Sequence, residues 1–427
     1  MDTSLFLVVP VPFRIVNGEY GCDYQACDGL MRWLEHFDRI VVAAPVLPDN
    51  EPHDFAKLET WKSIEQLPGF DRIELVPLPY AFKPLIYLRH YQRVRKLLSQ
   101  KIQECEYLCL MPCVWIGEWA GVACSEAIRL NRSYAIRADR VEHEVIRRML
   151  KEDKSLKLKT RIKDTLTVPI IERYIMNFMR QADLGLFQGQ DCYNAYAPAS
   201  RNPRLIYYVH SQKSDQISPE RLATKLDRIR QGEPLRLCYT GRATEMKGAI
   251  DWIEVIHDLK QRGMNFTATW IGEGNLLNDM KQLAQTLGVA DLIHFAGFMS
   301  DHRSTLDLMQ QQDVFMFCHK TPESARCLIE SLVCGLPLVG YESSYPKTLV
   351  AQQGGGVFVP LDDKAALADQ IEALDRDRDK LTTLVRQAAE TGRGFDEESV
   401  FQKLSDLIKG CVIPKSSSEK PAIMAVS

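Results

Sequence analysis

The sequence predicts an α/β protein built from two Rossmann-like, doubly wound domains that face each other across a cleft. The chain has 427 residues, which is too long for one ordinary hydrophobic core. Short apolar segments alternate with amphipathic segments of helical period, as in a parallel sheet covered by helices. A polar stretch, VHSQKSDQISPERLATKLDRIRQGEP, separates the two halves.

The bulk composition points to a cytoplasmic protein. Hydrophobic residues make up 45% of the chain, and a net charge of −3 gives no overall attraction to nucleic acid. No segment approaches the roughly 18 apolar residues of a membrane-spanning helix. The N-terminal MDTSLFLVVPVPF has an early acid and two prolines, so we expect a first strand and not a signal peptide.

The twelve cysteines include no Cys-x-x-Cys pair, and most lie inside apolar runs. Cys105, Cys109 and Cys113 recur at every fourth residue, with Cys124 further on, so a metal cluster is the alternative to buried reduced thiols. Because no histidine or carboxylate spacing supports the cluster, we expect no metal site.

The second half of the chain shows the strand and helix alternation most clearly. The expected strands are LRLCYTG, FTATWIGEG, LIHFAGF, VFMFCHK, LPLVGY and GGVFVP. The expected helices are AIDWIEVIHDLKQRG, NLLNDMKQLAQTLG, DHRSTLDLMQQ, the stretch around Glu330 and DKAALADQIEALDRD. The almost continuously apolar strands favour a sheet buried on both faces.

The first half shows the same alternation less regularly. Its expected strands are LFLVVPV, RIVVAAPV, IELVPLP, YLCLMPC and SYAIRA, and its expected helices are CDYQACDGLMRWLEHF, LIYLRHYQRVRKLLSQKI and IGEWAGVACSEAIRLN. The expected boundaries are 1–210 for the first domain, 211–234 for a linker, 235–397 for the second domain, 398–411 for a last helix and 412–427 for a flexible tail.

Ligands of doubly wound sheets bind at the carboxyl ends of the strands, so the loops there are the candidates for chemistry. In TGRATEMKG, Gly241 permits a tight turn, and Arg242 and Lys247 offer two cations that suit a diphosphate. Two solvated surface cations are the alternative. In IGEGN, Gly272 and Gly274 either let the backbone approach a ligand or only make a tight turn.

The stretch TPESARCLIESLVCGLPLVGY predicts a short helix with a free start. Ser324 is expected to cap a helix that begins at Ala325, whose first N–H groups and dipole favour a phosphate. Gly335 as the C′ residue and Pro337 after it end the helix within two to three turns.

Two glutamates accompany this helix, Glu323 in the loop before it and Glu330 on it. A carboxylate beside an anion site is unfavourable unless it accepts hydrogen bonds from hydroxyls, which sugars and riboses supply. The alternative is an ion pair between Glu330 and Arg326, four residues earlier on the same face.

Together these motifs resemble the C-terminal nucleotide-sugar domain of retaining glycosyltransferases of the GT-B fold, in glycosyltransferase family four (glycosyl transferases group 1). The resemblance rests on TGRATEMKG, WIGEG, IHFAGF and TPESARCLIESLVCGLPLVGY followed by GGGVFVP, in the family's order and spacing. It covers most of residues 235–410. Upstream it is carried only by FQGQDCYNAYAP and HSQKSDQIS, which look like a bacterial branch of that family.

The resemblance implies a metal-independent transferase that moves a sugar from a nucleotide diphosphate to a hydroxyl acceptor with retention of configuration. Arg242 and Lys247 would clamp the diphosphate, Glu330 would bind the ribose hydroxyls and Glu323 the hydroxyls of the donor sugar. Backbone groups of Cys327 and Leu328 would lie at the diphosphate, and the loop at Gly297–Phe298 would border the base. The implied donor-binding residues are Gly241, Arg242, Lys247, Gly272, Gly297, Phe298, Glu323, Cys327, Leu328 and Glu330.

One feature departs from the family pattern. The family usually places its two glutamates eight residues apart, which would put the first at Pro322, whereas here the spacing is seven. We favour Glu323 in that role, from a loop shifted by one residue. The donor sugar is the inference that this departure affects most.

The first domain would then bind the acceptor and part of the donor sugar. Gly18 and Gly21 follow the first strand, and the family has glycines near this place. Asp139, which follows another strand, is the first choice for a polar residue that touches the sugar, and His143 is the second, with an ordinary surface histidine as its alternative. His319, just before the Glu323 loop, is a further but weaker candidate for a contact to the sugar.

Catalysis is expected to rest on Arg242, Lys247, Glu323 and Asp139, with no cofactor and no general base assigned. Cations and helix amides suffice to stabilise charge on the leaving diphosphate. The acidic DRDRD near the C-terminus offers a superficial metal motif, but it follows a helix and is expected to be a solvated turn.

The acceptor is expected to be a glycan, a lipid-linked molecule or a small molecule, and polysaccharide assembly is the expected setting. The basic run RRMLKEDKSLKLKTRIKD (147–164) would give weak affinity for the inner face of an anionic membrane, with a solvated face as its alternative.

Rival functions are a sugar-nucleotide epimerase, a phosphorylase, a protein interaction scaffold and a nucleotide-sugar-binding protein with little or no turnover. The scaffold gives no reason for Arg242, Lys247 and Glu330 to share a site. The binding protein is the main alternative, because the shifted glutamate spacing is compatible with lost turnover.

Overall fold

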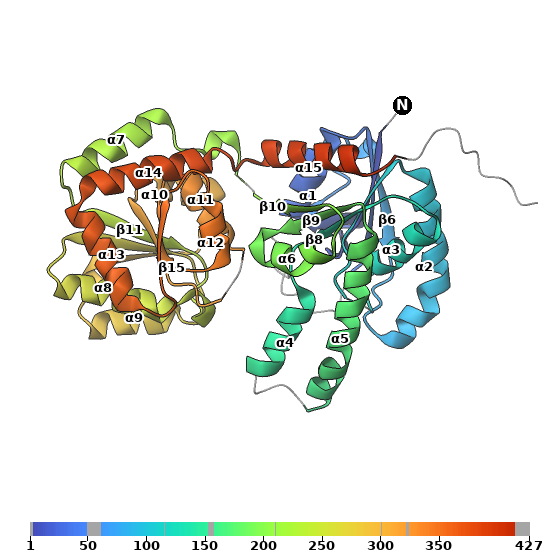
Figure 1. Ribbon diagram of the computed structural model, residues 1–427, viewed down its shortest axis with the longest axis horizontal. Coiled ribbons are helices and arrows are strands. Elements are labelled where there is room, and N and C mark those ends of the chain that lie inside the picture. The colour runs from blue at the N-terminus through green and yellow to red at the C-terminus, as the bar shows by residue number, and fades with distance from the viewer. Residues whose placement is uncertain are drawn as a thin grey trace, which may run out of the picture. The chain divides into compact units, whose positions relative to one another are not determined.

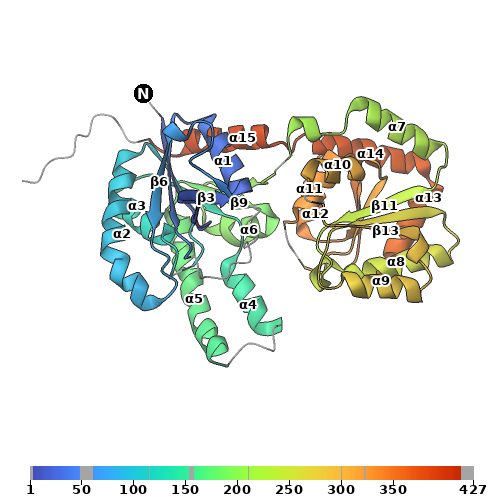
Figure 2. The ribbon, with the colours of Figure 1, turned by 180° about the vertical axis from the view of Figure 1, so that it is seen from behind.

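A computed structural model of the chain describes residues 3–48, 61–114, 116–152, 158–209, 211–299, 301–321 and 324–414. The chain divides into two compact units. One unit comprises the residues up to Ile206 together with those from Phe401 onward, and the other comprises Tyr207–Val400. In both units helices cover a parallel sheet (Figures 1 and 2).

The second unit is built on a six-stranded sheet in which every pairing is parallel. Its strands lie in the order β13 (Ile293–Gly297), β12 (Phe266–Ile271), β11 (Leu235–Thr240), β14 (Val314–Phe317), β15 (Leu338–Tyr341) and β16 (Gly356–Val359). The first strand in the chain, β11, lies between β12 and β14, so the sheet is doubly wound and its switch point lies between β11 and β14. All six strands were expected from the sequence, and they are confirmed.

Helices cover both faces of this sheet. They are α7 (Pro219–Arg230), α8 (Ala249–Gln261), α9 (Leu277–Thr286), α10 (His302–Gln310), α11 (Arg326–Val333), α12 (Ser344–Leu349), α13 (Lys364–Arg376) and α14 (Arg378–Gly392). Figure 1 shows α8, α9 and α13 on one side of the strands, and α10, α11 and α14 on the other. The DRDRD segment is the junction of α13 and α14, where Asp377 ends one helix and caps the next.

The segment 211–234, which we expected to be a linker, carries α7 and packs within the second unit. Ser218 caps this helix by accepting the Arg221 N–H at 3.2 Å. Leu226 and Ile229, three residues apart, are buried on one face of the helix. Lys225 is buried beside them and donates to the Cys334 carbonyl at 3.1 Å, which fixes α7 to the turn after α11.

The first unit contains a seven-stranded sheet, again with only parallel pairings. Its strands lie in the order β10 (Pro203–Ile206), β9 (Leu184–Gln188), β8 (Ala135–Ala138), β7 (Tyr107–Leu110), β1 (Ser4–Val8), β4 (Arg39–Pro45) and β6 (Ile73–Leu78). The strands β1, β7 and β9 are buried along their whole length, as a central strand covered on both faces must be.

A small antiparallel sheet, which the sequence did not indicate, follows the carboxyl ends of β1 and β4. It pairs β2 (Arg14–Val16), β3 (Glu19–Asp23) and β5 (Trp61–Ser63). Its strands have three to five residues, too few for a period-two pattern to be visible. Cys22 and Asp23, which we expected in the first helix, therefore belong to β3.

The helices of the first unit are α1 (Tyr24–Leu34), α2 (Pro84–Glu104), α3 (Ala120–Arg129), α4 (Glu142–Glu152), α5 (Leu158–Gln181) and α6 (Gly189–Tyr196). Figures 1 and 2 show α4 and α5 projecting together from the rest of the unit. None of the helices in the described ranges is long and apolar enough to cross a lipid bilayer.

The last helix, α15 (Glu397–Cys411), was expected at 398–411 and is confirmed. It begins in the second unit and continues into the first. There the Phe401 ring packs edge-on against Trp33, with ring centroids 5.0 Å apart, and Lys409 donates to the His36 carbonyl at 2.5 Å. The C-terminal residues thus complete the first unit.

We expect Gly248→Ala to destabilise the second unit more than Gly263→Ala. Both glycines have positive φ (64° and 76°), so both substitutions cost about 1–2 kcal/mol of backbone strain. A Cβ at Gly248 would also lie 2.0 Å from the Cys318 carbonyl oxygen, whereas nothing lies within 4 Å of one at Gly263. Thermal unfolding of the two variants measures the difference, and equal midpoints would contradict the close packing.

Candidate functional site

The loops at the carboxyl edge of the second unit's sheet are hydrogen-bonded to one another in series. The Gly241 N–H, after β11, donates to the Ile271 carbonyl at 2.9 Å, and the Gly272 N–H, after β12, donates to the Gly297 carbonyl at 2.8 Å. A Cβ at Gly272 would lie 2.2 Å from the Gly241 carbonyl oxygen. The two loops therefore meet backbone to backbone, and only glycine allows this approach.

The same edge is closed across the switch point. The Lys320 N–H, after β14, donates to the Met246 carbonyl at 2.9 Å in the loop after β11. Gly248, with φ of 64°, ends the short 3-10 helix Glu245–Lys247 and begins α8 directly against Cys318. The structure thus brings the loops that carry the predicted phosphate-binding residues to one place.

The cations of this edge are in different environments. Arg242 is exposed, and it makes no hydrogen bond or ion pair with the described part of the chain. Lys247 is buried in the 3-10 helix. Lys320 is already engaged, because its ammonium lies 2.9 Å from Asp251 and 3.3 Å from Asp362. Arg242 is therefore the cation with a guanidinium presented to an incoming ligand.

His319 supports the loop from below. Its Nε2 lies 2.9 Å from the Tyr239 hydroxyl, which lies directly under Gly241. Burial and the positive charge of Lys247 hold the pKa of His319 well below its usual value, so the imidazole is neutral. The sugar contact that we expected from His319 is untested, but the structure places this side chain in the core.

The helix α11 begins one residue later than expected. Ala325 is its N-cap residue, and no side chain of the described residues caps it, so the expected cap by Ser324 is wrong. The helix has eight residues, with Cys327 half-buried and Leu328 buried in its first turn. An uncapped helix start is a favourable place for an anion, because its N–H groups lack intrahelical acceptors.

The end of α11 is the predicted glycine stop. Gly335 has φ of 64°, its N–H donates to the Leu332 carbonyl at 2.9 Å, and the Leu336 N–H donates to the Ser331 carbonyl at 2.8 Å. These two bonds form a Schellman motif, and the C′ role of Gly335 is confirmed. The motif sets the length of α11 and hence the position of Glu330.

Glu330 is held by a histidine that the sequence analysis did not identify. Its Oε1 lies 3.2 Å from Nε2 of His302, at the start of α10, and the side chains are 18% and 42% exposed. The hydrogen bond to Glu330 raises the pKa of His302, against the effect of burial. The alternative ion pair with Arg326 is not formed between these two described residues. Oε2 of Glu330 has no partner among the described residues.

The turn after β13 exposes an aromatic ring. Phe298 is 64% exposed, which is unusual for a phenylalanine. The preceding Gly297 has φ of 71° and open space where a Cβ would lie, so the backbone conformation, and not crowding, calls for glycine.

Two positions of the predicted site, Pro322 and Glu323, lie outside the described residues. The role of Glu323 therefore stays a prediction.

The glycines predicted for the first unit's site occupy different positions. Gly18, with φ of 86°, lies at the turn between β2 and β3. Gly21 is buried within β3, where it pairs with Arg14 and Ser63. We expected Gly21 in a loop near a ligand. The structure instead places it in the middle of a ladder.

Asp139 follows β8, as predicted, but it is not a free carboxylate. Arg137 donates to both of its oxygens, at 3.1 and 3.0 Å. The two residues are only two apart in the chain, Arg137 near the end of β8 and Asp139 just after it, so their side chains are close enough to pair. A sugar hydroxyl would have to share Asp139 with this guanidinium.

His143 is buried and is not an ordinary surface histidine. Burial lowers its pKa, and its Nε2 lies 3.9 Å from Glu172. Its Nδ1 has no hydrogen-bond partner among the described residues. The imidazole is therefore neutral near pH 7.

A buried carboxyl that the sequence analysis missed lies at the start of α3. Glu118 is 3% exposed and accepts the N–H groups of Ala120 at 2.5 Å and Gly121 at 3.3 Å. Burial raises its pKa to about 8. An acidic residue two positions before an apolar helix could have been recognised in the sequence as an acceptor for the first N–H groups of that helix.

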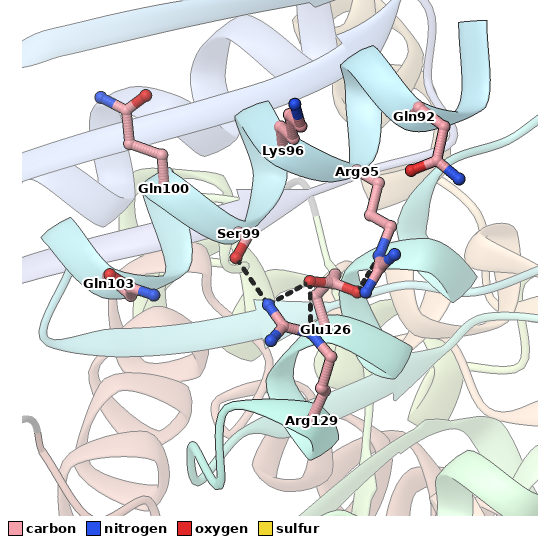
Figure 3. Close-up of a pocket in the computed structure, with 8 residues that line it drawn as sticks. All are labelled: Gln92, Arg95, Lys96, Ser99, Gln100, Gln103, Glu126 and Arg129. Atoms are coloured by element: carbon pink, nitrogen blue, oxygen red, sulfur yellow. Dashed lines mark hydrogen bonds and ion pairs between the residues drawn. The ribbon is translucent and has the colours of Figure 1, made fainter. Parts of the chain in front are cut away.

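A hollow between α2 and α3 is lined by Gln92, Arg95, Lys96, Ser99, Gln100, Gln103, Glu126 and Arg129 (Figure 3). Glu126 is nearly inaccessible and binds Arg95 at 2.6 Å and Arg129 at 2.7 Å, while Arg129 also donates to Ser99. The charges of the hollow are thus largely satisfied internally, and it contains none of the predicted site residues.

Comparison with known proteins agrees with this architecture. Residues 225–391 match the family model described as "Glycosyl transferases group 1". The chain is 27% identical over 201 residues to the amylovoran biosynthesis glycosyltransferase AmsK of Erwinia amylovora, covering 45% of this chain and 49% of AmsK. It is 25% identical over 195 residues to the alpha-D-kanosaminyltransferase of Streptomyces kanamyceticus, covering 46% and 50%. The chain spans about half the length of the curated relatives it matches.

The fold is shared with solved structures over nearly the whole chain. Anabaena HepE in complex with UDP superposes with a TM-score of 0.63 at 16% identity, covering 96% of this chain and 100% of HepE. The complex of HepE with UDP-glucose gives a TM-score of 0.59 at 17% identity and the same coverage. The protein has the GT-B fold of glycosyltransferases.

We expect His302 to titrate above its usual value of 6.5, and Glu330→Gln to return its pKa toward 6.5. Because the folded pKa is raised, the pair stabilises the fold fully below pH 6.5, and this stability is lost as the pH rises through the folded pKa. NMR titration of the histidine ring protons measures the shift. His143, in the other unit, is the internal control. A His302 pKa that Glu330→Gln leaves unchanged would contradict the pair.

Proposed function

We propose that the protein is a glycosyltransferase that moves a sugar from a nucleotide diphosphate donor to a hydroxyl acceptor. The observation that carries this proposal is the gathering of Arg242, Lys247, the start of α11 and Glu330 at one edge of a doubly wound sheet. This edge, at the switch point, is where ligands of such sheets bind.

The chemistry of these groups fits a leaving diphosphate. Arg242 is exposed and presents a planar fork to phosphate oxygens, while Lys247 adds a second positive charge. The start of α11, which no side chain of the described residues caps, adds N–H groups and the positive end of its dipole. Together these groups stabilise the negative charge that develops as the sugar leaves.

Glu330 suits the ribose. Its Oε1 is held by His302, which leaves Oε2 to accept from a hydroxyl. The exposed ring of Phe298 offers a flat surface to the base. UDP is the nucleotide we propose first, because it occupies the similar fold of HepE, with GDP as the alternative.

We further propose that the enzyme belongs to glycosyltransferase family four, acts in the cytoplasm, retains the anomeric configuration and needs no metal ion. Two fixed cations and a helix start supply the charge that a divalent ion would otherwise provide. The nucleotide phosphate itself would take the proton of the attacking hydroxyl on the same face of the sugar, so the proposal assigns no protein base.

A glycan or lipid-linked acceptor fits the setting best. AmsK is named for amylovoran biosynthesis, which supports polysaccharide assembly here. Asp139 and His143 in the first unit remain the proposed contacts to the transferred sugar, with Asp139 shared by Arg137.

Arg242→Ala should weaken UDP binding by about 1.5–3 kcal/mol, the value of a hydrogen bond to a charged group. Glu330→Ala should weaken UDP and GDP alike, because it touches only the ribose. Isothermal titration of the full chain, with and without EDTA, measures both effects. Arg376→Ala is the matched control, because this arginine is 75% exposed on α13 and, among the described residues, pairs only with Glu372.

If no nucleotide binds the wild-type protein, the proposed donor site is wrong. If nucleotide binding is lost when EDTA removes metal ions, the proposal that the enzyme needs no metal ion is wrong. Donor binding without consumption, across glycan, lipid-linked and small-molecule acceptors, would favour the nucleotide-sugar-binding protein.

We also propose weak association with an anionic membrane through the first unit. Of the basic run 147–164, residues 153–157 lie outside the described residues, so the argument rests on the neighbouring helices. Among the described residues, seven of the thirteen exposed large hydrophobic side chains lie just before α2, at its start or on α5, so these two segments carry more than half of them. These seven are Phe82, Leu85, Ile86, Leu88, Ile162, Leu166 and Ile170.

Positive charge accompanies these apolar side chains. Lys83 just before α2 and Arg89 and Arg93 on it are exposed, and no acid occurs between Phe82 and Glu104. An apolar stripe flanked by cations is typical of a helix that lies on an anionic lipid surface. Such a surface would present a lipid-linked acceptor.

We expect the protein to float with vesicles of phosphatidylglycerol and phosphatidylcholine at low salt and to separate from them at high salt. The double variant Leu85→Glu, Leu88→Glu should lose most of this binding, because it places charge in the apolar stripe. Leu361→Glu, at an exposed leucine of the second unit, is the control. No co-migration of the wild-type protein at low salt would remove the proposal.

A further inference from the structure

Two buried thiols of the first unit lie in contact. Cys22, on β3, and Cys27, in α1, have their Sγ atoms 3.1 Å apart. The residues are 3% and 0% exposed. The separation is about 1 Å more than the S–S bond of a disulfide, which is about 2.05 Å. Only four residues separate them in the chain, so a small local adjustment would bring the sulfurs to bonding distance.

The two thiols differ in acidity. The hydrogen bond between them lowers the pKa of Cys27 and raises that of Cys22, so Cys22 is the proton donor and Cys27 has the more thiolate character. The positive charge of Lys62, on β5, also lowers the pKa of Cys27. Since the thiolate is the reactive form, Cys27 is the nucleophile of the pair.

We propose that Cys22 and Cys27 form a reversible disulfide when the protein meets a peroxide. The Cys27 thiolate attacks the O–O bond and becomes a sulfenic acid, and the peroxide oxygen that leaves takes up a proton as water. The Cys22 sulfur then attacks the Cys27 sulfur, the S–S bond forms, and a second water leaves. Two thiols and one hydrogen peroxide thus give one disulfide and two waters, with two electrons passing from sulfur to oxygen.

Access to the pair depends on local opening. The Cys27 sulfur lies 3.7 Å from the Lys62 carbonyl and 3.9 Å from the Cys22 carbonyl, so β5 and β3 enclose it. The strand β5 has only three residues and lies at the edge of the small antiparallel sheet. Such an edge opens more readily than the core of the seven-stranded sheet, and a small oxidant can enter when it does.

The bond would tie β3 to α1. The strands β2 and β3 form a hairpin whose turn carries Gly18. Oxidation would fix the β3 strand of this hairpin at Cys22, near the end of the strand that lies away from the turn. In a reducing compartment, a pair of thiols of this kind responds to oxidants and does not serve as a permanent structural disulfide.

The test is a peptide map of the full-length protein after brief exposure to hydrogen peroxide, alkylation with N-ethylmaleimide in denaturant, and digestion with trypsin. Residues 15–32 contain both cysteines and no internal lysine or arginine, so they are released as one peptide. We expect this peptide to lose two hydrogen atoms and to carry no alkyl group. Dithiothreitol before alkylation should restore two alkyl groups.

Cys27→Ser should abolish the change and leave Cys22 alkylated, while Cys113→Ser, at a half-buried cysteine elsewhere in the unit, should leave it intact. The inference is overturned if both cysteines of the wild-type peptide stay alkylated while other cysteines oxidise. It is equally overturned if the peptide gains oxygen atoms in place of losing hydrogen. Neither outcome depends on sugar transfer.

Discussion

The candidate site depends on the backbone contacts between the loops that follow β11, β12 and β14. Gly272 packs against the Gly241 carbonyl, and Gly248 packs against the Cys318 carbonyl. Both contacts are so close that a Cβ atom on either glycine would clash with the carbonyl oxygen. These contacts fix the positions of Arg242 and Lys247 through the backbone, and the exposed Arg242 makes no hydrogen bond or ion pair with the described residues. Tyr239 and the neutral His319 fill the space beneath. The glycines thus set the path of the backbone at this edge of the sheet, and the residues between the glycines supply its positive charge.

How much of the fold could be predicted differed between the two units. In the second unit every strand is an apolar run bounded by a glycine or polar turn, so periodicity sufficed. In the first unit, β9 and β10 were missed, and so was the antiparallel sheet, whose strands are too short to show a period. The helix α5 contains Pro169, which ordinarily signals a break. Packing against the sheet outweighed that local preference.

The site shows a similar division. Gly335 and the glycine loops could be predicted, because a glycine in the local sequence indicates a backbone conformation with positive φ. The partner of Glu330 could not, since His302 lies 28 residues away on another helix, and only the sheet order brings them together. The pairing of Asp139 with Arg137 could have been anticipated, because the opposite charges are only two residues apart in the chain. The buried state of His143 depends on Tyr196 and other distant residues that the sequence does not connect to it.

The helix α15 has a consequence for the order in which the protein is made. Residues 207–400 are contiguous, so the second unit has its whole chain as soon as it leaves the ribosome. Residues 3–206 of the first unit are synthesised earlier but lack Phe401 and Lys409, which cover Trp33 and Phe37, until the second unit has been made. The first unit therefore reaches its final packing only after the second unit has been synthesised, and a nascent chain halted before α15 would leave these aromatic rings uncovered.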